Sequence, residues 1–258
     1  MPVQVPPSRW TLETIRSQID WLQGYSLSGI SRLLHRLGLG VRSARVQQYS
    51  PDPDYTNKLI YLELCLHEAA RERDKVAFVF LDEMGYTCWP DPGADWSGPG
   101  GPLADRGGAK QKQWRVIGAL NALSGQVNYL DGYIVGRQKV QAMYAQLVEA
   151  YPRAQRLYVA QDNWSIHTHP DVLTALAAWP HSEPVWLPTY SPWLNPIEKL
   201  WRWLRQRVLR LHRLAKDFSA LRQRVNRFLD QFAHGSEDLL SYVGLLGDGS
   251  LAPIILGT

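Results

Sequence analysis

The sequence has few cysteines and lacks long apolar runs, and each absence excludes a class of protein. Two cysteines, Cys65 and Cys88, cannot form a disulfide framework or a four-cysteine zinc site. No apolar run approaches the roughly 20 residues that a membrane-spanning helix requires. The first ten residues also lack the apolar centre of a signal peptide. We therefore expect a cytoplasmic protein with no membrane partner.

The residues that are present indicate a globular protein whose charges are unevenly distributed. The 258 residues are 45% hydrophobic and include 11 tryptophans, enough for one large core and a small appendage. Residues 1–50 carry a net charge of +4, residues 51–198 carry −5, and residues 199–227 carry +9. A basic run is usually a solvated helix face. This one is dense and contains two tryptophans, which favours a polyanionic partner.

The first fifty residues have the pattern of two short helices. Apolar residues recur there at helical spacing, Ser26 can cap the second helix, and Gly38 can end it. Two helices joined by a tight turn predict a partial helix-turn-helix, with Arg32 and Arg36 on an outward face that can meet DNA. An ordinary helical hairpin is the alternative.

The rest of the chain predicts an α/β fold in the order βββαβαβα. Apolar β-branched runs alternate with helical patterns, and a loop rich in glycine and proline follows the first strand. The expected strands are 76–82, 114–122, 126–135, 157–162 and 185–188, and the expected helices are 56–71, 140–151, 172–178, 196–209 and 218–232.

Three acidic residues lie where such a fold brings side chains together. Asp82 closes the first predicted strand, Asp162 closes the fourth, and Glu198 lies in the first turn of a helix. Singly, each is more often a turn cap or a residue that complements a helix dipole. Together, three carboxylates would repel one another without a cation, and oxygen ligands select Mg²⁺ or Mn²⁺. Two such ions about 4 Å apart can drive phosphoryl transfer.

Neighbouring residues have simpler interpretations. Glu83 points to the opposite side of the strand from Asp82, so we expect a supporting or structural role. His167 and His169 lack cysteine partners and make a poor zinc pair, so capping or packing is expected of them.

The stretches around the three acids resemble the DDE-type transposases of bacterial insertion sequences related to mariner elements. They read VFLDEMGY at Asp82, LYVAQDNWSIHTHP at Asp162 and LPTYSPWLNPIEKLWRWLR at Glu198, within about residues 75–215. The resemblance implies a ribonuclease-H-like mixed sheet flanked by helices, with these three acids as ligands of two Mg²⁺ or Mn²⁺ ions. It also implies supporting roles for Asn163, His167 and Asn195.

The resemblance also suggests how the chain is organised. The expected parts are a partial helix-turn-helix over 1–50, a linker and helix over 51–74, a catalytic domain over 75–235 and a C-terminal tail over 236–258. Family members usually carry two helix-turn-helix units, so a truncated or split reading frame is an alternative. The residues expected to contact DNA phosphates are Lys199, Arg202, Arg205, Arg207, Arg210, Arg32 and Arg36.

The predicted function is therefore a metal-dependent transposase that cleaves transposon ends and joins the freed 3′-hydroxyl to target DNA. The resemblance implies insertion at TA dinucleotides without a covalent protein intermediate. The expected partners are double-stranded DNA and, because two ends are joined, a second copy of the chain; the expected location is the nucleoid. The alternatives are a non-catalytic, domesticated or truncated DNA-binding protein, against which the intact acid triad counts, and a ribonuclease-H-like nuclease that cleaves without joining.

Overall fold

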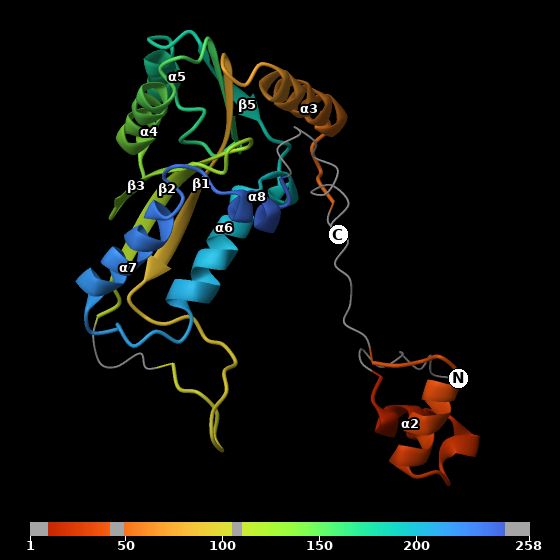
Figure 1. The fold of residues 1–258 in the computed structure, drawn as a ribbon. Helices are drawn as coiled ribbons and strands as arrows, with labels where there is room; N and C mark the ends of the chain where they lie inside the picture. Colours follow the sequence, from red (N-terminus) through yellow and green to blue (C-terminus); the bar gives the residue numbers. More distant parts are fainter. Residues whose placement is uncertain (1–9, 42–48, 105–109, 246–258) are drawn as a thin grey trace. The chain divides into compact units, whose positions relative to one another are not determined.

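A computed structural model describes residues 10–41, 49–104 and 110–245 (Figure 1). The chain divides into two compact units, Met1–Gln47 and Gln48–Thr258, and each is described by itself. Within the described residues, no helix is both long enough and apolar enough to span a bilayer.

The N-terminal unit contains two short helices, as the sequence predicts. Helix α1 spans Leu12–Gln18, a 3₁₀ turn spans Asp20–Leu22, and α2 spans Leu27–Arg36. The Ser26 side chain caps α2 by accepting a hydrogen bond from the amide of Gly29. The apolar core of this unit is small, because Leu22 and Ile30 are its buried hydrophobic residues among those described.

The second unit is built on a five-stranded mixed sheet in the order β3-β2-β1-β4-β5. Strand β1 pairs antiparallel with β2 and parallel with β4, and β4 pairs parallel with β5. This arrangement confirms the predicted α/β class and the βββαβαβα order. The strands are β1 Val76–Thr87, β2 Gln113–Asn121, β3 Val127–Gly132, β4 Arg156–Gln161 and β5 Ser182–Trp186.

The prediction that the first strand ends at Asp82 is wrong, because β1 continues to Thr87. Met84 and Tyr86 are buried while their neighbours are more exposed, so the alternation of a half-buried strand persists past the acid. Pairing with β4 covers only the first part of β1 and stops at Phe80, whereas pairing with β2 continues to Thr87. Asp82 therefore lies inside β1, just beyond the point where the parallel neighbour ends.

Helices cover both faces of the sheet (Figure 1). Alternate residues of β1 point to opposite faces: Phe78 and Phe80 join one apolar cluster, and Val79 and Leu81 join the other. The first cluster is completed by α3 Tyr55–Arg71, α6 Ile197–Leu204, α7 Phe218–Asp230 and α8 Glu237–Val243, and the second by α4 Arg137–Ala150 and α5 Pro170–Leu176.

Two segments near the C-terminus add detail that the sequence pattern does not give. After Leu204 the helical chain continues as a π-helical turn over Arg205–Leu209, so the predicted helix over 196–209 changes its hydrogen bonding midway. Within the segment expected to be a C-terminal tail, α8 buries Leu239, Leu240 and Val243 in the first apolar cluster. Residues 246–258 of that segment lie outside the described ones.

Candidate active site

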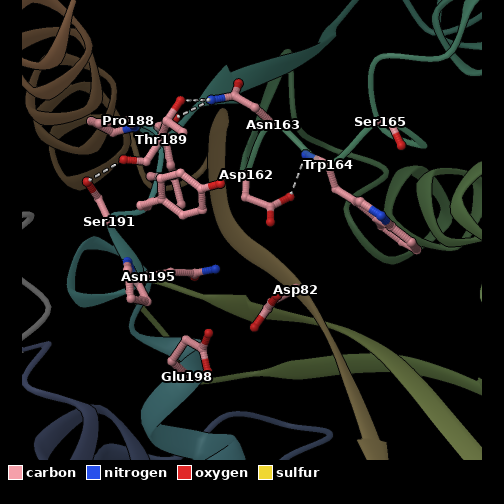
Figure 2. Close-up of a pocket in the computed structure, with 13 residues that line it drawn as sticks. Asp82, Asp162, Asn163, Trp164, Ser165, Pro188, Thr189, Ser191, Asn195 and Glu198 are labelled. Carbon is pink, nitrogen blue, oxygen red and sulfur yellow. Dashed lines mark hydrogen bonds between the residues drawn. The ribbon is translucent and has the colours of Figure 1, made fainter. Parts of the chain in front are cut away.

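Asp82, Asp162 and Glu198 line one pocket of about 520 Å³ (Figure 2). Asp82 comes from β1, Asp162 directly follows β4, and Glu198 lies in the first turn of α6. A loop over residues 187–192 forms another wall of this pocket. Since β4 stops beside the middle of β1, the open space beyond its end is where the three acids meet.

Asp82 is held by the helix that carries Glu198. The indole Nε1 of Trp201 donates a hydrogen bond to Asp82 Oδ2 at 3.0 Å. Trp201 is buried against β2, where a Cβ on Gly118 would lie 2.6 Å from the indole ring. Burial, with the negative charges of Glu198 and Glu83, raises the pKa of Asp82 to about 8. The pocket thus holds acidic groups that repel one another, and a bound cation would relieve that repulsion.

Asp162 is tied to the opposite side of the sheet through a buried histidine. His167 is fully buried, and its Nδ1 lies 3.1 Å from Asp162 Oδ1 while its Nε2 lies 2.9 Å from Glu83 Oε1. Burial alone would lower the pKa of His167, but hydrogen bonds to Asp162 and Glu83 outweigh it and raise that pKa to about 10. A protonated His167 therefore bridges the two carboxylates.

The same contacts act on Asp162 itself. Its Oδ1 also accepts a hydrogen bond from the backbone amide of Trp164 at 3.0 Å. Partial burial would raise the pKa of Asp162, but the hydrogen bonds from His167 and Trp164 outweigh it and lower that pKa. These contacts hold Oδ1 of Asp162 in place and keep the carboxylate ionised.

The structure assigns the neighbouring histidines and Glu83 to supporting contacts. His169 caps α5 by accepting a hydrogen bond from the amide of Asp171, and His167 is packed in the interior, so the expectation of capping or packing is confirmed. Glu83 Oε1 lies 2.9 Å from His167 Nε2. Strand alternation predicts that Glu83 points away from Asp82, but no spacing in the sequence indicates that His167 reaches it.

Asn163 and Asn195 also line the pocket, in different ways. The Nδ2 of Asn163 donates to the carbonyl of Leu187 at 3.0 Å and to Thr189 Oγ1 at 3.3 Å, so this residue holds the pocket loop (Figure 2). The Nδ2 of Asn195 donates to the carbonyl of Leu81 at 3.4 Å, while its buried Oδ1 has no partner among the described residues. An unpaired buried oxygen beside three acids suits a site that receives a ligand.

The pocket loop is also tied to a segment that lies far away in sequence. The amide of Thr189 donates to Asp52 Oδ2 at 2.8 Å, and Ser50 Oγ donates to the carbonyl of Thr189 at 2.6 Å. Asp52 in turn pairs with Lys58 at 2.8 Å. The next residue, Tyr190, has a left-handed backbone with φ of 53° and is 78% exposed. No sequence pattern pointed to this anchor.

The three acids do not form a finished metal centre. Among the residues that the structure describes, no three histidine, cysteine, aspartate or glutamate side chains stand close enough together to hold one ion. The acids nevertheless share one pocket, and their oxygen donors are of the type that Mg²⁺ and Mn²⁺ prefer. The raised pKa of Asp82 and the unpaired Asn195 oxygen are consistent with such an ion.

The basic residues expected to contact DNA fall into several groups. Lys199 is half-buried and Arg202 is exposed, and both belong to the helix turns that follow Glu198. Arg205 pairs with Asp91 at 3.1 Å and donates to the carbonyl of Gly85, so part of its role is structural. Of the others, Arg210 donates to the carbonyl of Ala94, Arg207 lines a separate groove, and Arg32 and Arg36 are exposed on α2.

Comparisons with known proteins point to one family. A family model described as DDE superfamily endonuclease matches residues 77–222, more than half of the chain. A 39 kDa protein of the insertion element IS630 from Shigella sonnei, itself described as uncharacterized, is 25% identical over 225 residues. The match covers 86% of this chain and 64% of that protein, so the chain spans less than two thirds of the length of this relative.

Solved structures share the fold. The Mos1 transposase paired-end complex with the left transposon end superposes with a TM-score of 0.63 at 16% identity, covering 99% of this chain and 81% of that one. The Mos1 mariner paired-end complex with Mn superposes with a TM-score of 0.61 at 18% identity, covering 96% and 78%. At this level of identity the likeness establishes the fold, which agrees with the predicted ribonuclease-H-like arrangement.

Proposed function

The chain belongs to the DDE superfamily of endonucleases, and we propose that it acts as a transposase that cuts DNA at transposon ends and joins the freed 3′-hydroxyl to target DNA. The observation that carries this proposal is the convergence of Asp82, Asp162 and Glu198 on one pocket beyond the end of β4. Three carboxylates from three separate elements suit metal-assisted phosphoryl transfer, and both steps of transposition are reactions of that type.

Asp82, Asp162 and Glu198 would hold Mg²⁺ or Mn²⁺, with two ions as the proposed number. When bound, these ions would activate the attacking water or 3′-hydroxyl and stabilise the leaving oxygen. The protein's own part is to fix the ligands. Trp201 donates a hydrogen bond to one oxygen of Asp82. The protonated His167 keeps Asp162 ionised and orients it, while Glu83 holds the other side of the imidazole. These supporting contacts determine how firmly each carboxylate is held in its orientation toward the pocket.

DNA is the proposed partner on both sides of the reaction. Lys199 and Arg202 follow Glu198 on α6 and would contact phosphates next to the scissile bond. Since two ends must be joined, a homodimer is proposed for the working complex. The names of the Mos1 structures, one of them a complex with a transposon end, support the choice of DNA ends as substrate.

The N-terminal unit is proposed to read the terminal repeats. Arg32 and Arg36 are exposed on α2, while Ile30 points into the small core, as in a helix that presents a polar face to DNA. Deletion of residues 1–41 should lower the discrimination between terminal-repeat DNA and random DNA while metal-dependent nicking persists. Equal discrimination by both proteins would show that another part of the chain reads the ends.

The test of the main proposal is a cleavage and joining assay. The full chain is incubated with a duplex that carries the inverted repeats flanking its own gene, a target plasmid, and Mg²⁺ or Mn²⁺, and all products are mapped. We expect cuts at the repeat ends and joined products. Cuts without joining would favour a structure-selective nuclease. Binding without cuts, under all metal conditions, would favour a DNA-binding protein that has lost catalysis.

A further inference from the structure

Three arginines line a groove that the proposed reaction does not use. Arg207 comes from the π-helical turn after α6, and Arg224 and Arg227 come from α7. The groove has a volume of about 700 Å³, and its other lining residues include Trp203 and Gln231. None of its lining residues belongs to the acidic pocket.

The groove and the acidic pocket lie on different sides of α6. On the sheet side, Trp201 contacts Asp82 and packs against Gly118 of β2. Two residues further on, Trp203 packs against Phe228 of α7 and stacks on Tyr242 of α8. Since positions two apart on a helix point in clearly different directions, the residues of the groove do not face the acids.

The charge of the groove is not neutralised by its neighbours. No described acidic side chain lies within 4.0 Å of the guanidinium groups of Arg207, Arg224 or Arg227, whereas the nearby Arg205 and Arg222 pair with aspartates. All three groove arginines are exposed. Their mutual repulsion is modest in water but remains unrelieved, and an anion in the groove would relieve it.

We propose that this groove binds the phosphodiester backbone of double-helical DNA at a segment other than the one being cut. The proposal rests on the proposed function, because it takes DNA to be the substrate. Arginine forks match phosphate oxygens in two-point hydrogen bonds, and such contacts carry no base specificity. The segment is a separate one because the groove arginines face away from the catalytic carboxylates.

The aromatic residues of the groove favour a duplex over unpaired bases. Single-strand sites stack bases on free aromatic faces. The ring centroids of Trp203 and Tyr242 lie 4.5 Å apart in a stacked arrangement, with ring planes 29° apart, and Trp203 also makes a T-shaped contact with Phe228. The packed indole therefore forms a rigid part of the groove lining and is not free to stack on a base. The three guanidinium groups are the groups left to contact DNA.

The first experiment measures the salt dependence of binding to a random-sequence duplex, without divalent metal. The triple variant Arg207→Gln, Arg224→Gln, Arg227→Gln is compared with wild type and with a matched control, Arg71→Gln, Lys75→Gln, Arg153→Gln. The control removes three exposed cations elsewhere on the same unit. We expect the plot of log affinity against log salt to become shallower by about three units of slope in the groove variant and to stay unchanged in the control.

The second experiment locates the DNA. Gln231→Cys, at the groove, and Arg153→Cys, away from it, are each mixed with duplex DNA whose tethered thiol is activated as a mixed disulfide, so that the protein thiolate displaces the leaving thiol and no oxidant is needed. The natural cysteines are buried, so they do not compete. We expect disulfide cross-linking for Gln231→Cys well above that for Arg153→Cys. The Arg→Lys triple variant keeps the charge and should retain most of the wild-type slope. Equal melting temperatures of the Gln and Lys triple variants would exclude misfolding as the cause of the loss in the Gln variant.

These outcomes separate this proposal from the transposase proposal. A groove variant with the wild-type slope, or cross-linking for Gln231→Cys no higher than for Arg153→Cys, would overturn the groove as a DNA site even if the protein cuts and joins DNA. A reduced slope with specific cross-linking supports the groove even if the wild-type protein cuts no DNA, because neither measurement depends on catalysis.

Discussion

The two sides of α6 carry opposite chemistry and are built in opposite ways. On the sheet side, the carboxylates of Asp82 and Asp162 are each fixed by a buried partner, Trp201 and His167. On the other side, the groove residues Arg207, Arg224 and Arg227 are exposed, and no described acid pairs with them. A site made of few, fixed groups should fail as a whole when one is removed. A surface of several similar exposed charges should weaken in steps.

The largest expected effect comes from neutralising one acid. Asp82→Asn, Asp162→Asn and Glu198→Gln each keep the size of the side chain and remove its charge. Since metal assistance contributes several kcal/mol to the transition state, we expect cleavage to fall by about a thousandfold or more in each variant. Gel-based cleavage of a repeat-end duplex measures this loss.

The matched control is Asp171→Asn, at the exposed start of α5 and outside the pocket, which should cleave at the wild-type rate. DNA binding should be kept in all four variants. Cleavage near the wild-type rate in any of the three acid variants would remove that residue from the site.

The second effect concerns the bridge between the two carboxylates. His167→Ala leaves Glu83 half-buried without its partner, and removing one member of a buried ionic pair costs about 3 kcal/mol. We expect the free energy of unfolding, measured with urea, to fall by that amount. Cleavage should fall too, because Asp162 loses the contact that orients it.

A comparison with Glu83→Gln sharpens this result. The amide can still accept a hydrogen bond from His167, so stability should fall less than in His167→Ala, and cleavage should be largely kept. If both variants lose stability but cleave like wild type per folded molecule, the bridge is structural and does not position Asp162.

The sequence alone predicts the elements and acids on the sheet side of α6 better than their surroundings. The strand order followed from alternating β-branched runs, and the three acids followed from their places at strand ends and in a helix turn. The predicted end of β1 is wrong because an acidic residue after an apolar run is typical of a strand end, although the alternation of Met84 and Tyr86 continues beyond Asp82. The Trp201 contact had a usable signal, since positions 198 and 201 are three apart and share a helix face.

Other features depend on tertiary contacts that no local pattern reveals. The basic run after Glu198 looked like one surface, but the π-helical turn and the packing of Trp203 separate Arg207 from Arg202. Likewise, Asp52 and Thr189 are 137 positions apart and meet only because α3 brings its N-terminal segment to the pocket loop. Such pairings are set by how elements pack, which spacing along the chain does not encode.

A third prediction tests whether basic residues act in steps. The double variant Lys199→Gln, Arg202→Gln should bind all duplexes more weakly. Its plot of log affinity against log salt should be shallower than that of wild type by about two units of slope. Arg202 follows Glu198 by four positions and shares its helix face, whereas Lys199 precedes Trp203 by four and shares the face of the groove. If each charge acts independently, the five-residue variant should lose about five units of slope. A combined loss clearly smaller than the sum would mean that the two sets of residues do not bind DNA independently. Fluorescence anisotropy over a salt series measures these slopes.

The smallest effect is expected at the anchor of the pocket loop. Asp52→Asn can still accept the hydrogen bond of the Thr189 amide but loses the ion pair with Lys58, as does Lys58→Met. A small shift of a pocket wall costs less than the loss of a ligand, so both variants should slow cleavage by at most about tenfold, and Asp52→Ala should slow it more.

The pH dependence of stability separates charge from shape at this anchor. The ion pair with Lys58 and the amide hydrogen bonds hold the pKa of Asp52 well below its ordinary value of 3.8. A carboxyl with a depressed pKa stabilises the fold above its unfolded pKa, and this contribution is lost as pH falls below 3.8 toward the folded value. The difference in melting temperature between wild type and Asp52→Asn should therefore be constant above this range and shrink as pH falls through it. A difference that stays constant down to the acid transition would mean that the Asp52 charge does not stabilise the loop, and that only the shape of its side chain matters there.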